Sequence, residues 1–365
     1  MDRTRGALEG VALNRGFWNG RRVFLTGHTG FKGSWLLLML RELGAEVHGY
    51  SLPPPTEPSL FNLLDLQTAC RHRTGDVRDL ASLEVALQDS RAEIVLHLAA
   101  QPLVRASYES PVDTYATNVM GTVHLLDACR RLQGLKAVEV ITTDKCYENC
   151  GWLWGYREND RLGGADPYSN SKAACELVVE AYRRSFFNPE SHSRHGVAIA
   201  SARAGNVIGG GDFAVDRLVP DAIKAFMAGE KLSIRNPLSI RPWQHVLEPL
   251  AGYLLLAERL HGDPTLAGGW NFGPRTDESA SVKVVAETLA RFWGEDSGWV
   301  QDPAEHPHEA TTLKLDSTKA RLELDWAPRL SLEQALELTV EWYRAFSREQ
   351  GLREITERQI REYLG

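Results

Sequence analysis

Short apolar runs alternate with longer amphipathic segments along residues 21–202. Strands are predicted at residues 22–26, 45–50, 94–98, 138–141 and 197–202, with a further strand just before Gly75. Helices are predicted at residues 31–43, 112–132 and 168–186, and Gly44 supplies a stop signal for the first of them. Strands that alternate with crossover helices indicate an α/β fold with a Rossmann-type, doubly wound parallel sheet that is covered by helices on both faces.

Beyond Arg203 the alternation becomes less regular. Glycine occupies positions 205, 209, 210 and 211, and proline recurs at 220, 237, 242 and 249. We therefore predict a first domain at residues 17–203 and a smaller C-terminal lobe at 204–350 that carries long functional loops. Some elements of this lobe are expected to return to the first sheet, and residues 270–273 are one candidate for such a return.

Charge, cysteine content and the longest apolar run narrow the class of protein. The 41 Lys and Arg residues against 48 Asp and Glu give a net charge of −7, which argues against a nucleic-acid partner. The run at 35–40 is far shorter than the ~20 residues of a membrane span, and residues 1–16 lack a signal-peptide core, so a cytoplasmic location is expected. The five scattered cysteines fit a reducing compartment, and Cys146 and Cys150 lack the neighbours of a metal site, so no metal is predicted.

A glycine-rich loop follows the first predicted strand and leads into the first helix. Its glycines recur as Gly-x-x-Gly-x-x-Gly, which lets the backbone approach a pyrophosphate at a helix N-terminus. This context favours a dinucleotide site over a plain glycine turn. Lys32 either adds charge near the phosphates or is a solvated helix side chain. The candidate cofactor contacts in the loop are Gly27, His28, Thr29, Gly30, Phe31, Lys32 and Gly33.

The second and third predicted strands carry further candidates for the cofactor. The acidic residue that grips the ribose of NAD about 20 residues after the glycine loop is missing. Ser51 remains as a hydrogen-bonding partner for the ribose, so the choice between NAD and NADP is weakly specified. Asp76 either accepts a hydrogen bond from the adenine amine or caps the helix that begins near Asp79.

Four polar residues, 142–145, follow the buried strand at 138–141, where ligands bind in open parallel sheets. Asp144 and Lys145 place an acid and a base side by side, and a loop ion pair is the alternative interpretation. Tyr168 and Lys172 share a helix face, where the lysine stabilises the phenolate so that the tyrosine can take a proton from an alcohol. The alternative is a packing tyrosine with a surface lysine.

Together these segments resemble the extended short-chain dehydrogenases/reductases, and among them the sugar-nucleotide 4,6-dehydratases. The likeness runs from about Phe17 to about Trp342. Its segments are 27–33, 96–101, 118–122, 143–149, 155–160, 168–172, 203–212, 235–237 and 241–246. Related enzymes for dTDP-glucose carry Asp-Glu in place of Asp144 and Lys145. The resemblance therefore favours the members that act on CDP-glucose.

The resemblance implies an NAD-dependent hydro-lyase that converts CDP-D-glucose, or a related nucleoside-diphosphate hexose, to the 4-keto-6-deoxy sugar and water. Such an enzyme supplies deoxysugars for the O-antigen of lipopolysaccharide. Tyr168, aided by Lys172 and Thr143, would take the 4-hydroxyl proton while NAD takes the C4 hydride. Lys145 would then remove the C5 proton, Asp144 would protonate the departing 6-hydroxyl, and the hydride would return to C6.

The resemblance also implies binding residues and an assembly. It adds Val77, Leu98, Ala99 and Ala100, together with Tyr168 and Lys172, to the cofactor contacts. It assigns Gln101, Asn206, Arg217, Arg235 and Arg241 to the substrate. Without the resemblance, the arginines are equally compatible with phosphate binding and with ordinary surface charge. Trp243 and Tyr253 are expected in the core, and residues 306–309 in a loop near the substrate. The helices at 112–132 and 168–186 resemble a pair that forms a homodimer interface, so a homodimer or homotetramer is expected.

Two other functions remain open at this point, besides a 4,6-dehydratase for dTDP or GDP sugars. A sugar-nucleotide 4-epimerase would share the glycine loop and the Tyr168–Lys172 pair, but it would not need Asp144 and Lys145. A nucleotide-binding regulatory protein on a retained dehydrogenase fold would be expected to have lost Tyr168 or Lys172, and both are present.

Overall fold

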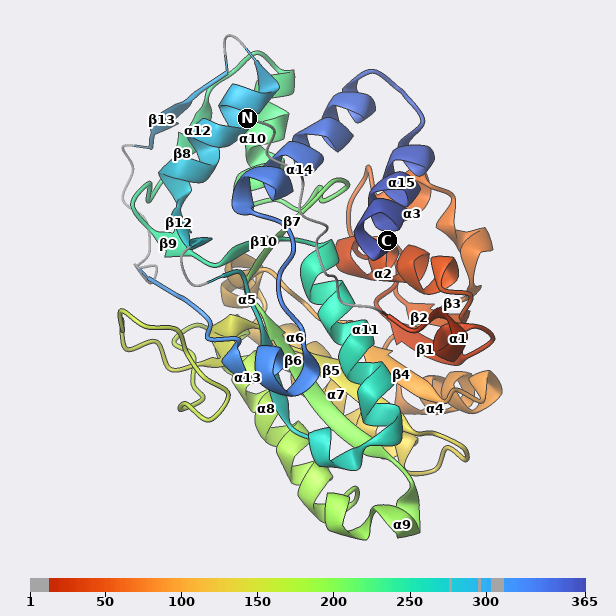
Figure 1. The fold of residues 1–365 in the computed structure, drawn as a ribbon. Coiled ribbons are helices and arrows are strands. Elements are labelled where there is room, and N and C mark those ends of the chain that lie inside the picture. The colour runs from red at the N-terminus through yellow and green to blue at the C-terminus, as the bar shows by residue number, and fades with distance from the viewer. Residues whose placement is uncertain (1–12, 276–277, 295–296, 303–311) are drawn as a thin grey trace, which may run out of the picture.

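The computed structural model describes residues 13–275, 278–294, 297–302 and 312–365 (Figure 1). Its centre is a seven-stranded sheet in the order β11-β6-β5-β4-β1-β2-β3, and each neighbouring pair is parallel. The strands are β1 (Arg22–Thr26), β2 (Glu46–Ser51), β3 (Arg71–Thr74), β4 (Ile94–His97), β5 (Ala137–Ile141), β6 (Ala198–Ala204) and β11 (Gly269–Phe272). From β1 the chain adds β2 and β3 on one side of the sheet. It then crosses back to add β4, β5, β6 and β11 on the other side of β1. The predicted doubly wound sheet is therefore confirmed.

Helices cover both faces of this sheet (Figure 1). One face carries α2 (Phe31–Glu42) and α11 (Leu247–Gly262), and the other carries α4 (Leu80–Ser90), α7 (Gly121–Cys129) and α8 (Pro167–Ser185). Alternate strand residues enter the two cores, since Val23 and Leu25 join the first and Phe24 joins the second. The apolar run at 35–40 is fully covered because α2 lies between the sheet, α11 and α15 (Leu352–Leu364).

The long helix predicted at 112–132 is divided in the structure. It consists of α6 (Pro111–Tyr115), a π-helical turn (Ala116–Met120) and α7. Asn118, in the π turn, is buried and donates hydrogen bonds to the Gln101 carbonyl and the Ser171 hydroxyl. The helix predicted at 168–186 is α8, where Asp166 caps the first turn and Pro167 occupies its first position.

The C-terminal half builds a second group of elements beside the sheet. Its helices are α10 (Leu218–Met227), α12 (Val282–Trp293) and α14 (Leu332–Ser347). Three two-stranded sheets join β7 (Asn206–Ile208) to β10 (Trp243–His245), β8 (Leu232–Ile234) to β13 (Trp299–Gln301), and β9 (Ile240–Arg241) to β12 (Ala280–Ser281). Between β10 and β12 in the sequence, the chain returns to the main sheet as β11, where Trp270 pairs with Ala202. The return predicted at 270–273 is therefore confirmed.

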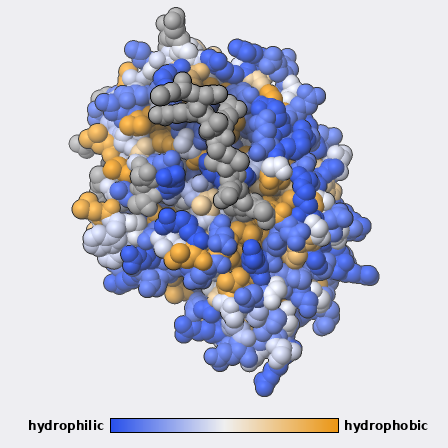
Figure 2. Space-filling model, in the orientation of Figure 1, coloured by the Kyte–Doolittle hydropathy of each residue, from blue (hydrophilic) through white to orange (hydrophobic). Residues whose placement is uncertain are grey.

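Short helices fill the connections. They are α1 (Arg15–Trp18), α3 (Leu60–Leu63), α5 (Val104–Glu109), α9 (His192–His195) and α13 (Thr318–Leu324). The face of the molecule in Figure 2 is mainly hydrophilic, with small apolar patches between polar side chains. Within the described ranges, no helix has the length and apolarity that crossing a membrane demands.

Candidate active site

A cavity of about 1660 Å³ opens where the central strands end. Its wall includes Gly27 after β1, Leu98 after β4 and Thr142 after β5. From there it extends to the C-terminal elements, where Arg217 and Ser239 line it. The cavity therefore occupies the crevice at the carboxyl ends of parallel strands, next to the point where the strand order reverses.

Close backbone contacts require two of the loop glycines. Gly27 has a φ of +74°, and a Cβ atom there would lie 2.7 Å from the Ala99 nitrogen. A Cβ on Gly33 would lie 2.1 Å from the Gly27 carbonyl oxygen. Gly30 precedes α2 without a side-chain cap, so the N–H groups of the first turn remain for a ligand. The loop therefore fits the pyrophosphate of a dinucleotide.

Most of the predicted cofactor residues share the cavity wall. Ser51 is buried there and its hydroxyl lies 2.8 Å from that of Thr29. The members of the set that line the cavity are Gly27, Thr29, Gly30, Phe31, Lys32, Gly33, Ser51, Asp76, Val77, Leu98, Ala99, Ala100, Tyr168 and Lys172. These residues come from separate strand ends and from α8, and the fold gathers them around the glycine loop.

His28 does not line the cavity. Its ring lies over Gly49, where a Cβ atom would approach it to 2.6 Å, and its Nε2 is 2.7 Å from Nδ1 of His72. Burial, and then the neighbouring His72, lower the pKa of His28 to about 3. The side chain therefore packs among β2, β3 and α3, and its predicted contact with the cofactor is not supported by the geometry.

Asp76 is not a helix cap. Asp79 caps α4 by accepting a hydrogen bond from the Ser82 nitrogen, so that alternative was wrong for Asp76. The Asp76 carboxylate lies on the cavity wall and forms an ion pair of 2.7 Å with Arg78. The side-chain hydrogen bond from Arg78 holds the pKa of Asp76 below its ordinary value in spite of partial burial.

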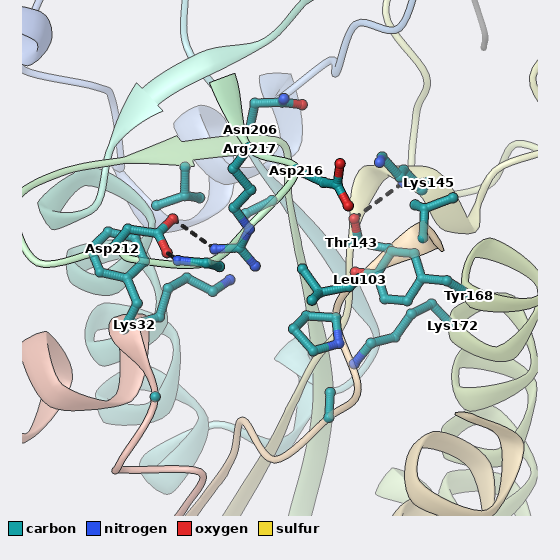
Figure 3. Close-up of a pocket in the computed structure, with 18 of the residues that line it drawn as sticks. Lys32, Leu103, Thr143, Lys145, Tyr168, Lys172, Asn206, Asp212, Asp216 and Arg217 are labelled. Atoms are coloured by element: carbon teal, nitrogen blue, oxygen red, sulfur yellow. Dashed lines mark hydrogen bonds and ion pairs between the residues drawn. The ribbon is translucent and has the colours of Figure 1, made fainter. Parts of the chain in front are cut away.

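Lys32 points into the cavity, so its interpretation as a solvated helix side chain was wrong. Its Nζ lies 3.5 Å from the Tyr253 hydroxyl, and Figure 3 shows it beside Asp212 and Arg217. Burial is the main reason that the pKa of Lys32 falls to about 7, and the positive charges of Lys172 and Arg217 lower it further. This amine can therefore exchange a proton near neutral pH.

Tyr168 and Lys172 lie on the opposite wall, on the same face of α8 (Figure 3). The Lys172 amine donates a hydrogen bond of 3.2 Å to the Ile141 carbonyl at the end of β5. Burial raises the pKa of Tyr168, whereas a hydrogen bond with Thr143 and the charge of Arg217 act in the opposite direction. Both side chains are buried, so the interpretation as a packing tyrosine with a surface lysine was wrong for the lysine.

A 3₁₀ turn, Asp144–Cys146, places the acid/base residues beside this pair. The Lys145 amine lies 5.9 Å from the centre of the Tyr168 ring. Asp144 is 1% exposed, and its Oδ1 accepts a hydrogen bond of 3.0 Å from Thr143. Its Oδ2 has no hydrogen-bond partner in the described part of the chain. Burial raises the pKa of Asp144 although Lys145 and Thr143 oppose the shift, so the carboxyl is suited to give up a proton.

The C-terminal wall contributes cations. Arg217 forms an ion pair of 2.8 Å with Asp212, and Asn206, Arg235 and Arg241 also line the cavity. Gln101 does not line the cavity, although its neighbours Ala100 and Pro102 do. Its side-chain amide instead donates hydrogen bonds to the Leu103 carbonyl and the Thr114 hydroxyl. Residues 306–309, predicted near the substrate, lie outside the described residues. Trp243 and Tyr253 belong to the core, as expected.

Two acidic residues and an arginine of the wall were missed by sequence reasoning. Arg105 of α5 and Asp216 of the C-terminal half form an ion pair of 2.9 Å across the cavity, and both line it. Asp212 forms an ion pair with Arg217. It directly follows the glycine cluster at 209–211, and that position could have indicated a residue of the site. Arg105 had no such signal, because its partner is more than a hundred residues away in the sequence.

Sequence comparisons relate the chain to known families. It matches the family described as GDP-mannose 4,6 dehydratase over residues 24–339. It is 51% identical over 353 residues to CDP-glucose 4,6-dehydratase of Salmonella typhimurium, which covers 96% of this chain and 98% of that protein. It is 30% identical over 278 residues to dTDP-glucose 4,6-dehydratase of Streptomyces griseus, which covers 75% of this chain and 77% of that protein.

Solved structures share the fold at lower sequence identity. The dTDP-glucose 4,6-dehydratase of Bacillus anthracis in complex with NAD matches with a TM-score of 0.74 and 21% identity, over 91% of this chain and 99% of that one. The UDP-glucose 4-epimerase of Thermotoga maritima with UDP-glucose matches with a TM-score of 0.76 and 24% identity, over 89% of this chain and 99% of that one. These likenesses establish the fold, which dehydratases and epimerases have in common.

Proposed function

We propose that this chain, which belongs to the GDP-mannose 4,6 dehydratase family, is an NAD-dependent hydro-lyase that converts CDP-D-glucose to CDP-4-keto-6-deoxy-D-glucose and water. Support for the substrate comes from the 51% identity to a CDP-glucose 4,6-dehydratase over nearly the whole of both chains. One structural observation carries the chemistry: Asp144 is buried beside Lys145, Tyr168 and Lys172, and one of its carboxyl oxygens has no hydrogen-bond partner among the described residues. An epimerase has no need for that acid.

The glycine loop and the strand ends around it are suited to hold NAD. The first turn of α2 would face the pyrophosphate, Ser51 and Asp76 would take the adenosine end, and Leu98 and Ala100 would flank the bound dinucleotide. Held by these residues, NAD would supply a hydride acceptor for C4 of the hexose and a hydride donor for C6. The redox state of the cofactor is therefore the same before and after each turnover.

Tyr168 would act as the base for the 4-hydroxyl group. Its phenol must give up a proton in a buried site, which the hydrogen bond from Thr143 and the charge of Arg217 favour. Lys172 is held over the end of β5 by its bond to Ile141, and it lies on the same face of α8 as Tyr168. This pair accounts for oxidation at C4 and for the reverse proton transfer.

Lys145 and Asp144 would carry out the elimination. The new 4-keto group acidifies the proton at C5, which Lys145 removes. The C6–O bond then breaks, and Asp144 gives its proton to the departing hydroxyl, so that one water molecule leaves. The product is completed when C6 receives the hydride and C5 regains a proton. The number of atoms and electrons balances, and only water is lost from the sugar.

The C-terminal wall is proposed to bind the nucleotide diphosphate. Asn206, Arg217, Arg235 and Arg241 line that side of the cavity, and the guanidinium fork suits phosphate oxygens. We assign residues 17–203 to the NAD-binding domain and most of 204–350 to the sugar-nucleotide lobe, apart from elements such as α11 and β11 that return to the sheet. The product would serve deoxysugar synthesis for lipopolysaccharide in the cytoplasm.

A homodimer or larger assembly is proposed through the helices beside the reactive pair. Exposed apolar side chains occur on α6, the π turn and α8, where Val112, Met120 and Leu177 are 80%, 46% and 61% exposed. These elements contact one another, so the side chains belong to one helical layer. Light scattering at micromolar concentration should give at least twice the chain mass, and a monomer mass would contradict the assignment.

One experiment tests the activity directly. The protein is incubated with CDP-, dTDP-, UDP- and GDP-hexoses, with and without added NAD, and the products are weighed by mass spectrometry. We expect CDP-glucose to yield a product lighter by one water, whereas an epimerase would leave the mass unchanged. Tyr168→Phe should abolish product formation, and Tyr363→Phe, a buried tyrosine outside the cavity, should not.

A further inference from the structure

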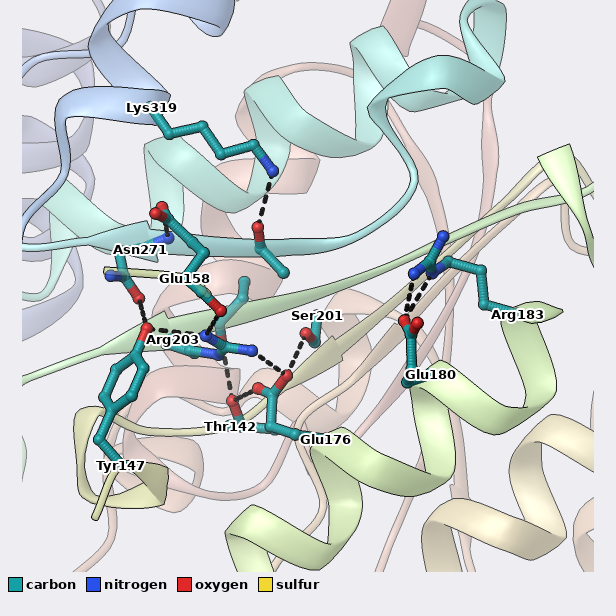
Figure 4. A network of polar contacts seen from close by, with 12 residues as sticks. Thr142, Tyr147, Glu158, Glu176, Glu180, Arg183, Ser201, Arg203, Asn271 and Lys319 are labelled. Atoms are coloured by element: carbon teal, nitrogen blue, oxygen red, sulfur yellow. Dashed lines mark hydrogen bonds and ion pairs between the residues drawn. The ribbon is translucent and has the colours of Figure 1, made fainter. Parts of the chain in front are cut away.

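The turn that carries Thr143, Asp144 and Lys145 is anchored at both ends by polar side chains. Thr142 directly precedes it, and Tyr147 directly follows the 3₁₀ turn. Both are buried, with exposures of 5% and 1%. Their partners come from other elements, shown in Figure 4, and not from the turn itself.

Glu176 anchors the first end. The Thr142 hydroxyl donates a hydrogen bond to Oε1 of Glu176, one helical turn beyond Lys172 on α8. Oε2 of the same carboxylate accepts a bond of 2.6 Å from Ser201 and one of 2.7 Å from Nη2 of Arg203, both on β6. The carboxylate therefore joins the end of β5, the helix that bears Lys172, and the neighbouring strand.

Arg203 anchors the second end. Its Nη1 donates a bond of 2.7 Å to the Tyr147 hydroxyl and one of 3.0 Å to the Glu158 carbonyl. The Tyr147 hydroxyl in turn donates a bond of 2.7 Å to the side chain of Asn271 on β11. One ion pair, Glu176 with Arg203, thus holds the residue before the turn and the residue after it.

This pair is deeply buried, since both residues are 4% exposed. Burial opposes the charge on Glu176, but Arg203 and the hydroxyls of Ser201 and Thr142 hold the pKa of its carboxyl below the ordinary value. Burying two charges rarely adds stability compared with apolar packing, so a role in specifying local geometry is the hypothesis for this pair. In this protein the pair would fix the geometry of the turn that carries Asp144 and Lys145.

We propose that the Glu176–Arg203 ion pair is a clamp that positions Asp144 and Lys145 for the loss of water. Both members are positioning residues, because their hydrogen bonds run to Thr142 and Tyr147 and not to Asp144, Lys145 or Tyr168, although the charge of Glu176 also raises the pKa of Lys172. The inference rests on the proposed function, in which those two residues serve the elimination and Tyr168 serves the oxidation. Loosening the clamp should therefore slow the second step more than the first.

Tyr147→Phe tests the second anchor with the smallest change, since it removes only the hydroxyl between Arg203 and Asn271. Single turnovers of CDP-glucose with NAD are quenched in acid and weighed, which separates the 4-keto hexose before water loss from the dehydrated product. We expect water loss to slow about tenfold, since small misplacements of catalytic groups have effects of this size or larger. The rate of C4 oxidation and the substrate Kd should change less than twofold.

A second measurement reports on the base. In deuterated water, wild-type protein should incorporate deuterium at C5 of the product, and the 4-keto hexose trapped from the Tyr147→Phe variant should show slowed exchange there. Thr142→Val tests the first anchor in the same way, because it removes the hydroxyl that donates to Glu176. Thr142→Ser keeps that hydroxyl, so its rate of water loss should be close to that of the wild type. Tyr363→Phe and Glu180→Gln are matched controls, because Glu180 pairs with Arg183 on the same helix and touches no residue of the turn (Figure 4).

Equal slowing of oxidation and water loss in these variants would overturn the clamp, since the pair would then act on the whole site. Unchanged rates in both Tyr147→Phe and Thr142→Val would also overturn it. Failure of the wild-type protein to form any dehydrated product would instead refute the proposed function, and the clamp with it. Melting temperatures within a few degrees of wild type separate these outcomes from simple unfolding.

Discussion

Two buried carboxylates lie near the end of β5, and their surroundings are opposite. Glu176 is 4% exposed and accepts bonds from Thr142, Ser201 and Arg203, which lower its pKa against the effect of burial. Asp144 is 1% exposed, leaves one oxygen without a partner in the described residues, and has a raised pKa. A fully bonded carboxylate is fixed and favours its charged form, whereas a half-bonded buried one holds its proton to higher pH and has an oxygen for a ligand.

The difference separates a supporting role from a chemical one. Asp144 lies in the turn after β5 and Glu176 lies on α8, and burial does not distinguish them. The number of hydrogen-bond donors around each carboxylate does distinguish them. Substitutions at and around the two residues test how far their roles differ.

Asp144→Asn should have the largest effect. The amide keeps the size of the side chain but has no proton to give to the departing hydroxyl, so dehydration should fall about a thousandfold. Oxidation at C4 should persist, and the 4-keto hexose should accumulate in acid-quenched turnovers. Asp89→Asn, at an exposed pair with Arg73, is the control. A variant that dehydrates at more than a tenth of the wild-type rate would remove Asp144 from its role.

Glu176→Gln should act mainly on stability. The amide cannot satisfy Arg203 as the carboxylate does, and an uncompensated buried charge costs about 3 kcal/mol or more in the free energy of unfolding. Urea unfolding followed by circular dichroism measures the loss. Glu180→Gln on the same helix should cost less than about 0.5 kcal/mol, because its ion pairs are partly exposed. Equal losses in the two variants would show that the Glu176 pair is not special.

The double variant Glu176→Gln with Arg203→Met should lose less stability than the sum of the single variants. Once the carboxylate is gone, removing the guanidinium also removes the buried charge, so a coupling of about 1–3 kcal/mol is expected. The comparison requires urea unfolding of all four proteins under one condition. Additive losses would mean that the two side chains do not act as a pair.

The pH dependence of stability should show the smallest, but opposite, effects. Burial raises the pKa of Asp144 in the folded protein above its unfolded value. Its contribution to the free energy of unfolding is therefore present below the unfolded pKa and is lost as pH rises through the folded pKa. The folded pKa of Glu176 is lowered, so its contribution is present above the unfolded pKa and is lost as pH falls through the folded one.

Each slope is at most about 1.4 kcal/mol per pH unit. Asp144→Asn should therefore flatten the loss of unfolding free energy as pH rises from the unfolded pKa of an aspartate through the folded pKa of Asp144, and Glu176→Gln should flatten the loss as pH falls through the folded pKa of Glu176. Urea titrations at a series of pH values give both slopes. The same direction of change in the two variants would contradict the assigned pKa shifts.

Local pattern was sufficient for the elements that recur with simple periods. The strands of the parallel sheet, the helix start at Asp166 and Pro167, and the four-residue spacing of Tyr168 and Lys172 all follow from neighbours in the chain. The helix at 112–132 was less well predicted, because the π turn depends on Asn118 reaching Gln101 and Ser171. A contact over many residues overrode the helical period there.

Individual side-chain directions were the weakest predictions. Lys32 was equally compatible with phosphates and solvent, and the fold directs it into the cavity beside Tyr253. His28 and Gln101 were predicted in the site because they stand in its motifs, yet their hydrogen bonds lead them elsewhere. A motif specifies the path of the backbone, whereas each side chain follows the partners that the tertiary structure offers.

The doubly wound sheet, the dinucleotide loop, the Tyr–Lys pair and the second acid/base pair could all be predicted from the amino-acid sequence, since they depend on short periods and fixed spacings. The ion pair of Glu176 with Arg203 beside the turn of Asp144 became visible only in the fold, as did the Asp144 oxygen that has no partner among the described residues. Those properties depend on how many donors surround each buried carboxylate, and the donors come from strands and helices far apart in the chain.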